Sequence, residues 1–354
     1  MRVAVVGAGV IGLSAAWRLA RSGVAVTVYD DAPGSGPSRV AAGMLAPVTE
    51  AWFGEEPLIA LMLAGHARWP GFAAELTGET GHDLGYRDEG TLLVGADADD
   101  LVAIERLGGF YAAWGLSVTA LSGRACRERE PLLFPGVRGG LLTPDHQVDP
   151  RRVHAALMAA LTGLRVPIEA RRIQTLTELD ADVVVVAAGC GSAALAGLPV
   201  RPVKGQLLRL RAPDGAPPGF DHVVRGLVAG REVYVVPRRD GEVVVGATTD
   251  ERRDLVPTAG AAYELLESAL RLLPHLAEYA VTEHDVGLRP ATPDNVPLVG
   301  RLPEDVVVAS GHYRHGILLA PVTADVVTAL VTGGPSPVPV ERLDPGRFAD
   351  AHLA

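Results

Sequence analysis

Three short segments rich in β-branched residues stand far apart along the chain, at residues 2–6, 182–187 and 306–310. Such predominantly apolar runs, each ending near glycine, predict strands that are buried on both faces of a parallel sheet. Helical periodicity over residues 10–22 and a further apolar run at 24–29 complete a strand–helix–strand unit at the start. The pattern therefore predicts that the beginning, middle and end of the chain share one sheet.

Helix and loop signals fill the intervals between these strands. Residues 31–43 are rich in Gly, Pro and Ser and predict a loop. Asp149 followed by Pro150 predicts a helix start, because Asp caps the first turn and Pro fits its first position. Periodicity predicts helices at 56–77 with an interruption at Pro70, and at 97–108, 150–161, 259–273 and 317–331.

A different pattern occupies residues 203–250, where three runs favour strands and Asp240-Gly241 marks a hairpin turn between the last two. This region predicts an antiparallel sheet apart from the parallel one. We expect an α/β fold, α+β overall, with a Rossmann-like nucleotide-binding domain built from discontinuous segments and an antiparallel-sheet substrate domain. The predicted division assigns 1–81, 141–202 and 287–350 to the first domain and 82–140 and 203–286 to the second.

The composition limits the classes of protein that fit. The 354 residues carry a formal charge of −10 and are 48% hydrophobic, which supplies a core and excludes a disordered chain. No cluster of Lys and Arg forms a basic face, so we expect no nucleic-acid partner. Cys126 and Cys190 make neither a disulfide framework nor a zinc site. With an apolar strand directly after Met1 and Arg2 and no apolar run that could span a bilayer, we expect a cytoplasmic protein without membrane contact.

The turn after the first strand reads Gly7-Ala8-Gly9-Val10-Ile11-Gly12, which is the G-x-G-x-x-G spacing between a strand and a helix. Its glycines allow a tight turn, close approach of a pyrophosphate and close helix–strand packing, while the helix N-terminus attracts the diphosphate. Asp30 lies 18 residues after Gly12 at the end of the second strand and predicts contacts with ribose hydroxyls; Asp31 is the alternative. With no arginine beside it, Asp30 disfavours NADP and leaves NAD and FAD open.

Several further motifs resemble the D-amino-acid oxidase family of flavoproteins, and the resemblance covers essentially the whole chain. They are AAGMLAP at 41–47, VKGQ at 203–206, YVVP at 234–237, GLRP at 287–290 and GHYRHGILLAP at 311–321. Within the family, the motifs are most similar to the branch that oxidises glycine for thiamine biosynthesis. The resemblance implies a non-covalent FAD, a small amine substrate, dioxygen as the second partner and a homo-oligomer.

The chemistry that the resemblance implies is oxidation of a small amine at its α-carbon. A hydride passes to flavin N5, an imino acid leaves, and dioxygen reoxidises the flavin and yields hydrogen peroxide. For glycine, the imino acid is iminoacetate, a precursor of the thiamine thiazole. Sarcosine, a small D-amino acid or another secondary amine is an alternative substrate. A related dehydrogenase that passes electrons to a quinone and a non-catalytic dinucleotide-binding regulator are alternative functions.

Three residues are candidates for catalysis. The Arg289 guanidinium suits the substrate carboxylate, which it binds through two parallel charge-assisted hydrogen bonds, and the resemblance implies this role. The Tyr234 phenol could donate to the same carboxylate while its ring walls the pocket. Arg314, in the loop before the last helix, is assigned to the electrostatics of the site. The helix from Gly316 presents its positive end to the reduced flavin.

The remaining site residues come from the resemblance alone. The expected substrate pocket comprises Met44, Ala46, Thr49, Glu50 and Glu232. The expected cofactor contacts, besides Gly7, Gly9, Val10, Ile11, Gly12 and Asp30, are Ala42, Gly43, Met44, Leu45, Ile173, Gly189, Gly311, His312, Arg314, His315, Gly316 and Ile317. We expect no metal and no general base, because solvent can take the amine proton; the two histidines then serve packing.

Four departures from the family pattern stand out. Glu232 replaces a histidine present in some members, His315 stands where asparagine is common, and Arg39 stands where a small hydroxyl residue is frequent. An arginine at position 39 could supply positive charge near the flavin phosphates. Residues 163–182 are shorter than usual, which predicts a trimmed β-meander after the helix at 150–161.

Overall fold

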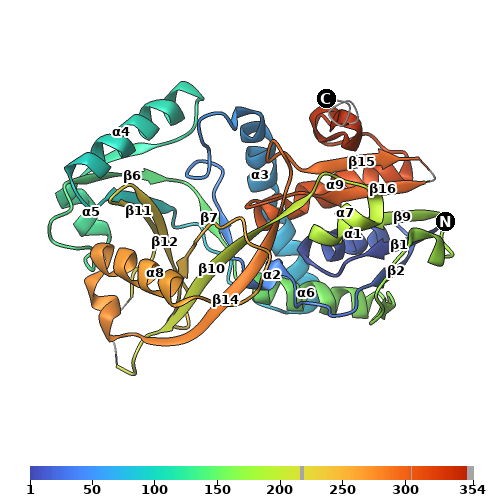
Figure 1. Cartoon of the computed structure of the whole chain (residues 1–354), viewed down its shortest axis with the longest axis horizontal. Helices are drawn as coiled ribbons and strands as arrows, with labels where there is room; N and C mark the ends of the chain where they lie inside the picture. The colour runs from blue at the N-terminus through green and yellow to red at the C-terminus, as the bar shows by residue number, and fades with distance from the viewer. Residues whose placement is uncertain (216–218, 304, 349–354) are drawn as a thin grey trace.

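The computed structural model describes residues 1–215, 219–303 and 305–348 and contains two large sheets that lie side by side (Figure 1). The six-stranded sheet has the order β15 (Leu298–Leu302), β16 (Val306–Ser310), β9 (Val183–Val186), β1 (Arg2–Val6), β2 (Ala25–Tyr29) and β8 (Ile168–Glu169). All neighbouring pairs are parallel except β15 and β16. The prediction that the start, middle and end of the chain share one sheet is confirmed.

Helices bury both faces of this sheet. Val3 and Val5 of β1 pack into a core with the helices α1 (Val10–Arg21), α3 (Glu56–Thr80), α6 (Pro150–Gly163) and α9 (Gly316–Thr332). The alternate side chains of β1, Ala4 and Val6, pack on the other face, where α7 (Ser192–Ala196) lies. The interruption expected at Pro70 is wrong, since α3 runs through it. Trp69 and Phe72 are buried on either side of that proline, and their packing offsets the lost backbone hydrogen bond.

The eight-stranded sheet has the order β14 (Ala280–Ala291), β10 (Arg201–Arg211), β13 (Glu242–Gly246), β12 (Arg231–Pro237), β11 (Val223–Val228), β4 (Thr91–Gly95), β6 (Gly139–Thr143) and β5 (Thr119–Ser122). The hairpin expected at Asp240-Gly241 joins β12 to β13. The sheet is mixed rather than antiparallel, because β4 and β11 pair in parallel. These two strands come from separate segments, so no hairpin fixes their relative direction.

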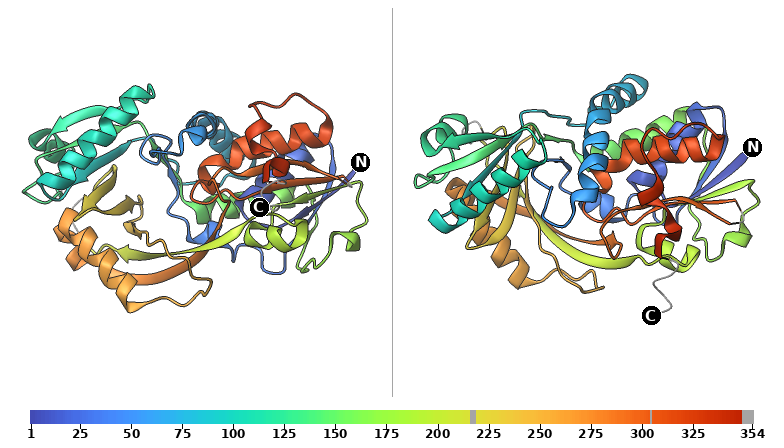
Figure 2. Two further views of the ribbon diagram at one scale, coloured as in Figure 1. Left: turned by 45° about the horizontal axis from the view of Figure 1, so that its top comes forward. Right: turned by 90° about the horizontal axis from the view of Figure 1, so that it is seen from above.

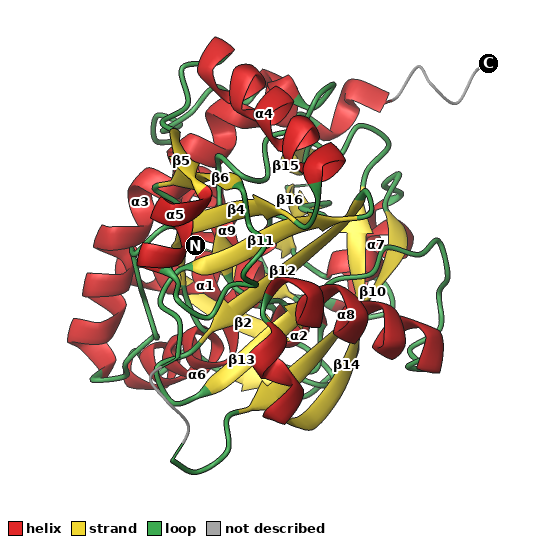
Figure 3. Cartoon of the chain, turned by 90° about the vertical axis from the view of Figure 1, so that its left-hand side faces the viewer, coloured by secondary structure: helices red, strands yellow, loops and turns green. Residues whose placement is uncertain are grey.

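Helices cover the outer face of this sheet, and α8 (Ala259–Leu272) crosses its strands (Figure 3). At the β4–β6–β5 end, α5 (Gly123–Arg129) packs on this outer face with Leu92 and Val94, whereas α4 (Ala98–Ala113) packs on the inner face against Leu93 and Leu141. The long strands β10 and β14 lead from one sheet towards the other (Figure 2). The division into two domains stays a prediction, and its limits at residues 141 and 287 fall inside β6 and β14.

Short elements lie between the two sheets and beside each of them. The pair β3 (Met44–Leu45) and β7 (His146–Gln147) is antiparallel, and α2 (Pro37–Val40) is a single helical turn within the segment expected to be loop. The remaining helical turns are η1 (Leu176–Glu178), η2 (Gly189–Gly191), η3 (Pro274–Glu278) and η4 (Glu341–Leu343). Between α6 and β9 the chain forms only β8 and η1, as expected of a trimmed meander. Among the described residues, no helix combines the length and apolar character that crossing a bilayer requires.

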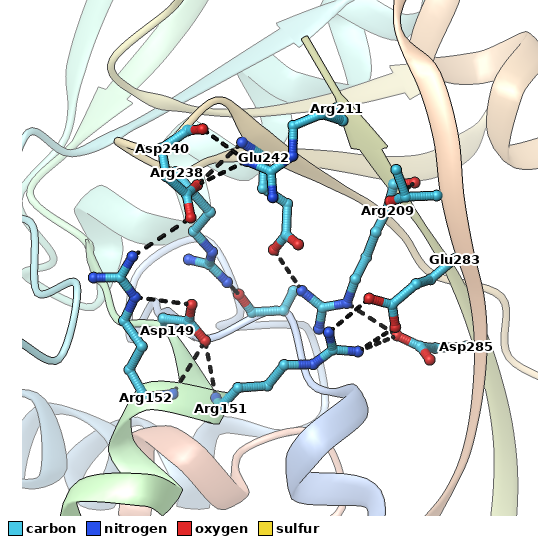
Figure 4. A network of polar contacts seen from close by, with 12 residues as sticks. Asp149, Arg151, Arg152, Arg209, Arg211, Arg238, Asp240, Glu242, Glu283 and Asp285 are labelled. Atoms are coloured by element: carbon cyan, nitrogen blue, oxygen red, sulfur yellow. Dashed lines mark hydrogen bonds and ion pairs between the residues drawn. The ribbon is translucent and has the colours of Figure 1, made fainter.

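An arginine–carboxylate network ties α6 to the eight-stranded sheet (Figure 4). The fully buried Arg209 of β10 donates to Asp285 Oδ2 at 3.0 Å and to Glu242 Oε1 at 2.6 Å. Arg151 of α6 donates to the same Asp285 oxygen at 3.0 Å and to both oxygens of Glu283. Because Arg151 and Arg209 share one carboxylate, the first turn of α6 is fixed relative to β10 and β14.

Candidate functional site

Four predicted cofactor residues meet at one edge of the six-stranded sheet. Gly7 follows β1, Asp30 follows β2, Gly189 follows β9 and Gly311 follows β16, and these strands are parallel neighbours. The carboxyl ends of parallel strands lie together, which is where open α/β sheets bind ligands. The three glycines have positive φ angles of 111°, 56° and 76° in that order, so the chain turns there in conformations that favour glycine.

The turn at residues 7–12 packs as its spacing predicts. A Cβ on Gly7 would collide with the Ala187 carbonyl group, and one on Gly12 would collide with the Gly7 carbonyl oxygen. At Gly9, by contrast, a Cβ would meet only Ser38 Oγ, at 3.4 Å, so its backbone stays accessible. The first and third glycines thus serve close packing, and the second leaves space above the turn.

Asp30, rather than Asp31, reaches the glycine turn. Its carboxylate accepts hydrogen bonds from the backbone N–H of Ala8 at 2.7 Å and of Ala32 at 2.8 Å. Asp31 instead lies 3.8 Å from an exposed Arg172 guanidinium. Ser38 Oγ of α2 accepts from the Val10 N–H at 3.1 Å, so a hydroxyl group touches the turn one position before Arg39.

The residues at this edge fit FAD. Neither α1 nor α9 has an acidic residue in its first turn, and neither N-cap residue makes a side-chain cap. Both helices follow parallel strands of one sheet, so their positive ends lie on the same edge and suit a diphosphate and an anionic ring. FAD would be held by the turn at 7–12, by Asp30 and by the start of α9. The Ile173 side chain is buried in the core, which leaves its backbone for an adenine contact.

The segment at residues 42–45 lies between the two sheets. Ala42 and Met44 pack with Tyr234 of β12, while Leu45 is buried on the opposite side. A Cβ on Gly43 would collide with the Val148 carbonyl oxygen. This alternation turns Met44 to the eight-stranded sheet and Leu45 to the helical core, and Ala46 beyond them is buried as well.

Arg238, directly after β12, holds this segment in place. Its guanidinium is buried and donates to the carbonyl oxygens of Ala42 and Val148, the latter at 3.0 Å, and to Gln147 Oε1 at 3.1 Å. Burial lowers the pKa of Arg238 to about 10, so the group stays charged at neutral pH. The segment at residues 42–45 is thereby fixed to the sheet that carries the predicted substrate residues.

Strand register places Arg289 and Tyr234 on the inner face of the eight-stranded sheet. Tyr234 lies opposite both Gly246 and Arg225, and Leu207 lies opposite Gly246. Leu207 and Val203 share one face of β10, and Val203 lies opposite Arg289. Since paired residues project to the same face, Arg289, Tyr234 and Arg225 all project from this surface.

Two glycines make room for Arg289 and Tyr234, the two residues predicted to bind the substrate carboxylate and called the clamp below. The Arg289 guanidinium fills the space where a Cβ of Gly205 would lie, and the Tyr234 hydroxyl fills the corresponding space at Gly246. Arg289 donates to the Thr248 carbonyl oxygen at 3.0 Å, and no carboxylate of the described residues pairs with it. Burial raises the pKa of the Tyr234 phenol and the nearby Arg289 charge opposes that rise. The site thus presents a guanidinium without a carboxylate partner among the described residues, together with a neutral phenol.

Next to the clamp, Glu50 lies between two arginines. Arg225 binds Glu50 Oε1, and Arg314 Nε lies 3.7 Å from Glu50 Oε2. Arg225 also reaches Glu232 at 3.3 Å, and Arg314 reaches Glu55 at 3.1 Å. Burial would raise the pKa of Glu50, but the two arginines lower it to about 2. The structure therefore brings the predicted residues Glu50, Glu232 and Arg314 together around Arg225.

The buried Asp145 fixes the turn that carries Thr49 and Glu50. It accepts hydrogen bonds from the N–H groups of Val48 and Thr49 and from the hydroxyl groups of Thr49 and Thr143, at 2.7 to 3.2 Å. Burial raises the pKa of Asp145, and these four donors oppose the rise. Thr49, a predicted pocket residue, therefore also donates two hydrogen bonds to Asp145.

The two histidines of the last loop are neutral near pH 7. His312 is buried, its Nε2 lies 3.0 Å from Thr323 Oγ1, and burial lowers its pKa to about 3. Burial lowers the pKa of His315, the N-cap residue of α9, to about 4. A Cβ on the following Gly316 would meet only His312 Cβ, at 3.9 Å, and Ile317 is buried. The N-terminus of α9 therefore carries only the partial positive charge of the helix dipole, because neither histidine adds a charge.

Sequence reasoning missed Arg225, Asp145, Arg238 and the two clamp glycines. Arg225 lies in VVRGLV, a strand that was not predicted because Arg and Gly interrupt its apolar run. The signal for a functional position is a single arginine within a mostly apolar run, and it can be used only once the neighbouring strands are known. That Arg39 could supply positive charge near the phosphates stays a prediction; its carbonyl oxygen accepts hydrogen bonds from Arg151 and Arg209.

Comparison with known proteins places this geometry among flavoproteins. The family model described as FAD dependent oxidoreductase matches residues 2–330. The bifunctional protein ThiO/ThiG of Synechocystis is 34% identical over 98% of this chain and 54% of its own length, so the chain spans about half of such relatives. A putative thiamine biosynthesis oxidoreductase ThiO of Rhizobium etli is 35% identical over 94% of this chain and 97% of its own. The crystal structure of glycine oxidase from Geobacillus kaustophilus has a TM-score of 0.90 at 30% identity and covers 98% of this chain and 99% of its own.

Proposed function

Since this chain belongs to the FAD dependent oxidoreductase family, we propose that it oxidises glycine at the α-carbon to iminoacetate with dioxygen as the electron acceptor. Relatives named glycine oxidase and thiamine biosynthesis oxidoreductase support the choice of substrate and of pathway. In this reaction glycine loses two electrons and two protons, the C–N bond becomes an imine, and dioxygen gains them as hydrogen peroxide. Iminoacetate then supplies the thiamine thiazole.

The observation that carries the proposal is the pairing of Arg289 with Tyr234 on one sheet face. The guanidinium has no carboxylate partner among residues 1–215, 219–303 and 305–348, and its charge acts on the pKa of the Tyr234 phenol on the same sheet face. A free, planar donor set of this kind fits a carboxylate in a two-pronged contact. A regulator that only binds a dinucleotide does not require such a carboxylate-binding group.

The chain's own residues do the positioning. Arg289 and Tyr234 hold the substrate carboxylate, which fixes the α-carbon and the amine relative to the sheet. Met44, packed against the sheet near Tyr234, walls the pocket towards the cofactor edge. When bound, FAD would supply the hydride acceptor, flavin N5, and would hold the two electrons until dioxygen accepts them. The positive end of α9 favours the negative charge that such a reduced ring carries.

The charged groups beside the clamp set the local electrostatics. Glu50 and Glu55 balance Arg314, and Glu50 and Glu232 balance Arg225. We take the amine proton to leave to solvent, because His312 and His315 are buried and have low pKa values. The proposal includes Ala46, Thr49 and Glu232 as pocket residues, a homo-oligomeric assembly, a cytoplasmic location, and no nucleic-acid or membrane partner.

The test is anaerobic addition of glycine to the purified protein while its visible flavin band is recorded. Bleaching by glycine supports both the amine oxidation and the choice of substrate. Bleaching by sarcosine or a D-amino acid but not by glycine would leave the site assignment and overturn the substrate. A protein that neither carries nor takes up a flavin would overturn the proposal as a whole.

A further inference from the structure

A backbone carbonyl group fixes the direction of the Arg289 guanidinium. The side chain leans from β14 across β10, and one terminal nitrogen donates to the Thr248 carbonyl oxygen at 3.0 Å, in the segment that follows β13 on the other side of β10. Among the described residues this is the one hydrogen bond of the guanidinium. The orientation of the clamp therefore depends on how this carbonyl oxygen becomes free to accept.

The segment after β13 continues along β10 with a shifted register. Leu207 lies opposite Gly246, and Lys204 lies opposite Asp250. Between these pairs β10 advances three residues, from 204 to 207, while the other segment advances four, from 246 to 250. One extra residue of this kind is a β-bulge. Beyond it, Lys204 and Asp250 exchange both backbone hydrogen bonds, at 2.8 and 2.9 Å, so antiparallel pairing resumes.

In this register Gln206 and Thr248 form the next pair. Regular antiparallel pairing would join them through two N–H···O=C hydrogen bonds. One of these forms, from the Thr248 N–H to the Gln206 carbonyl oxygen at 3.1 Å. The Gln206 N–H instead donates to the side-chain Oγ1 of Thr248, at 3.0 Å. The hydroxyl group thus occupies the place of the carbonyl group in the ladder, and the carbonyl oxygen is left for Arg289.

Two side chains of β10 hold the chain beyond Thr248. Lys204, the single lysine of the sequence, is fully buried, and its ammonium group donates to Asp254 Oδ1 at 2.7 Å and to the Val256 carbonyl oxygen at 2.6 Å. The Gln206 side-chain amide donates to the hydroxyl group of the N-cap residue of α8 at 3.2 Å and accepts from its N–H at 2.9 Å. Because a buried ammonium group without a partner is costly, these contacts keep the segment closed on β10.

We propose that Thr248 is a positioning residue of the clamp, whose hydroxyl group replaces its own carbonyl group in the β-ladder so that the carbonyl oxygen sets the direction of Arg289. The inference rests on the proposed function, since the clamp is where the substrate carboxylate binds. Threonine suits this exchange, because its hydroxyl group competes with backbone acceptors and its branched Cβ restricts the side chain to few rotamers.

The consequence for binding is a guanidinium that is oriented before the ligand arrives. An arginine side chain has many rotamers, and ordering it on binding weakens the affinity for the ligand. The contact with Thr248 uses one N–H group and leaves others for two parallel hydrogen bonds to a carboxylate. Loss of the Thr248 hydroxyl group should therefore weaken carboxylate binding, although this hydroxyl group does not itself contact the ligand.

Thr248→Val removes the hydroxyl group and keeps the shape of the side chain. The Gln206 N–H then takes the carbonyl oxygen at position 248 as its acceptor, as in a regular ladder, and Arg289 loses this oxygen. We expect the dissociation constant of acetate, followed through the flavin absorbance of the holoenzyme, to rise about tenfold. KM for glycine should rise equally, while kcat and the dissociation constant of FAD stay within about threefold.

Two further variants separate the hydroxyl group from the fold. Thr248→Ser keeps the hydroxyl group and should bind acetate within about twofold of the wild type. Thr249→Val removes a hydroxyl group from the exposed neighbouring residue and should leave acetate affinity and KM unchanged. An unchanged acetate affinity in Thr248→Val, or an equal loss in Thr248→Ser, would overturn the proposal. If Thr248→Val does not fold, Thr248→Ala takes its place in the same comparison.

A crystal structure of the Thr248→Val holoenzyme supplies a readout that does not depend on turnover. We expect the Arg289 guanidinium to lie beyond hydrogen-bond distance of the carbonyl oxygen at position 248, and a retained contact would overturn the proposal. If glycine bleaches the wild-type flavin and Thr248→Val binds acetate normally, the positioning role fails and the proposed function stands. If glycine does not bleach the wild-type flavin but the variant structure has lost the contact, the proposed function fails and the positioning of Arg289 by Thr248 stands.

Discussion

The guanidinium group of Arg289 occupies the space above Gly205 that a Cβ at that position would fill. The two residues come from β14 and β10, the longest pair of strands in the molecule, and Gly205 lies opposite Gly287, two positions before Arg289. The Arg289 side chain therefore leans across the neighbouring strand β10, over Gly205, instead of projecting straight out from the sheet. Its direction is set by the absence of a side chain on the neighbouring strand, and Gly246 does the same for Tyr234.

Gly205→Ala is expected to impair substrate binding far more than folding. The colliding atoms are at the flexible end of Arg289, so the guanidinium moves and loses its contact with the Thr248 carbonyl oxygen. An overpacking cost of about 1–3 kcal/mol predicts a KM for glycine raised by roughly tenfold or more. Steady-state oxidation and thermal unfolding measure the two effects. Gly260→Ala, in open space on α8, is the matched control; equal KM values in both variants would contradict the role of Gly205.

Arg289→Lys is expected to lower kcat/KM for glycine although it keeps the charge. Lysine cannot form the two parallel hydrogen bonds of a guanidinium, and one hydrogen bond to a charged group is worth about 1.5–3 kcal/mol. We expect a loss of about 10- to 100-fold, together with weaker binding of acetate, while the dissociation constant of FAD stays near that of the wild type. A variant with unchanged acetate affinity would assign the carboxylate to another residue.

Glu50 is expected to make stability depend on acidity. Its folded pKa of about 2 lies below the ordinary value of 4.5, so the unfolded chain takes up a proton first as the pH falls. The stabilisation is complete above pH 4.5 and is lost between 4.5 and 2, in total about 3 kcal/mol at about 1.4 kcal/mol per pH unit. Urea unfolding of the wild type and of Glu50→Gln from pH 7 to pH 3 checks this. The difference between their free energies of unfolding should shrink with falling pH, and a constant difference would contradict the lowered pKa of Glu50.

Arg238→Met is expected to weaken FAD binding. The variant leaves the carbonyl oxygens of Ala42 and Val148 without their buried donor, at about 1–3 kcal/mol for each unpaired group, and releases the segment packed against Tyr234. Quenching of flavin fluorescence on the apoprotein measures the dissociation constant, which should rise at least tenfold. Arg239→Met, at the exposed neighbouring position, should change neither affinity nor stability.

The parallel sheet and its cofactor edge were predictable from the sequence, because buried strands, the glycine turn and Asp30 are local signals with fixed spacing. The clamp could be named only through resemblance. What places Arg289 and Tyr234 on one sheet face is the register of four strands, β14, β10, β13 and β12, and Gly205 and Gly246 carry no chemical group to notice. Arg225 escaped for the same reason: its partners Glu50 and Glu232 are close in space, and Glu50 is remote in sequence.

The position of β16 beside β9 at the cofactor edge has a consequence for synthesis. Residues 306–310 pair with β9, and α9 after them covers α1, so a nascent chain that ends before them exposes one edge of β9 and the apolar face of α1. Unpaired strand edges and bare helix faces are the features that lead to aggregation during folding. The nucleotide edge therefore closes only after β16 and α9 have been synthesised, and the free edge of β9 stays exposed until then.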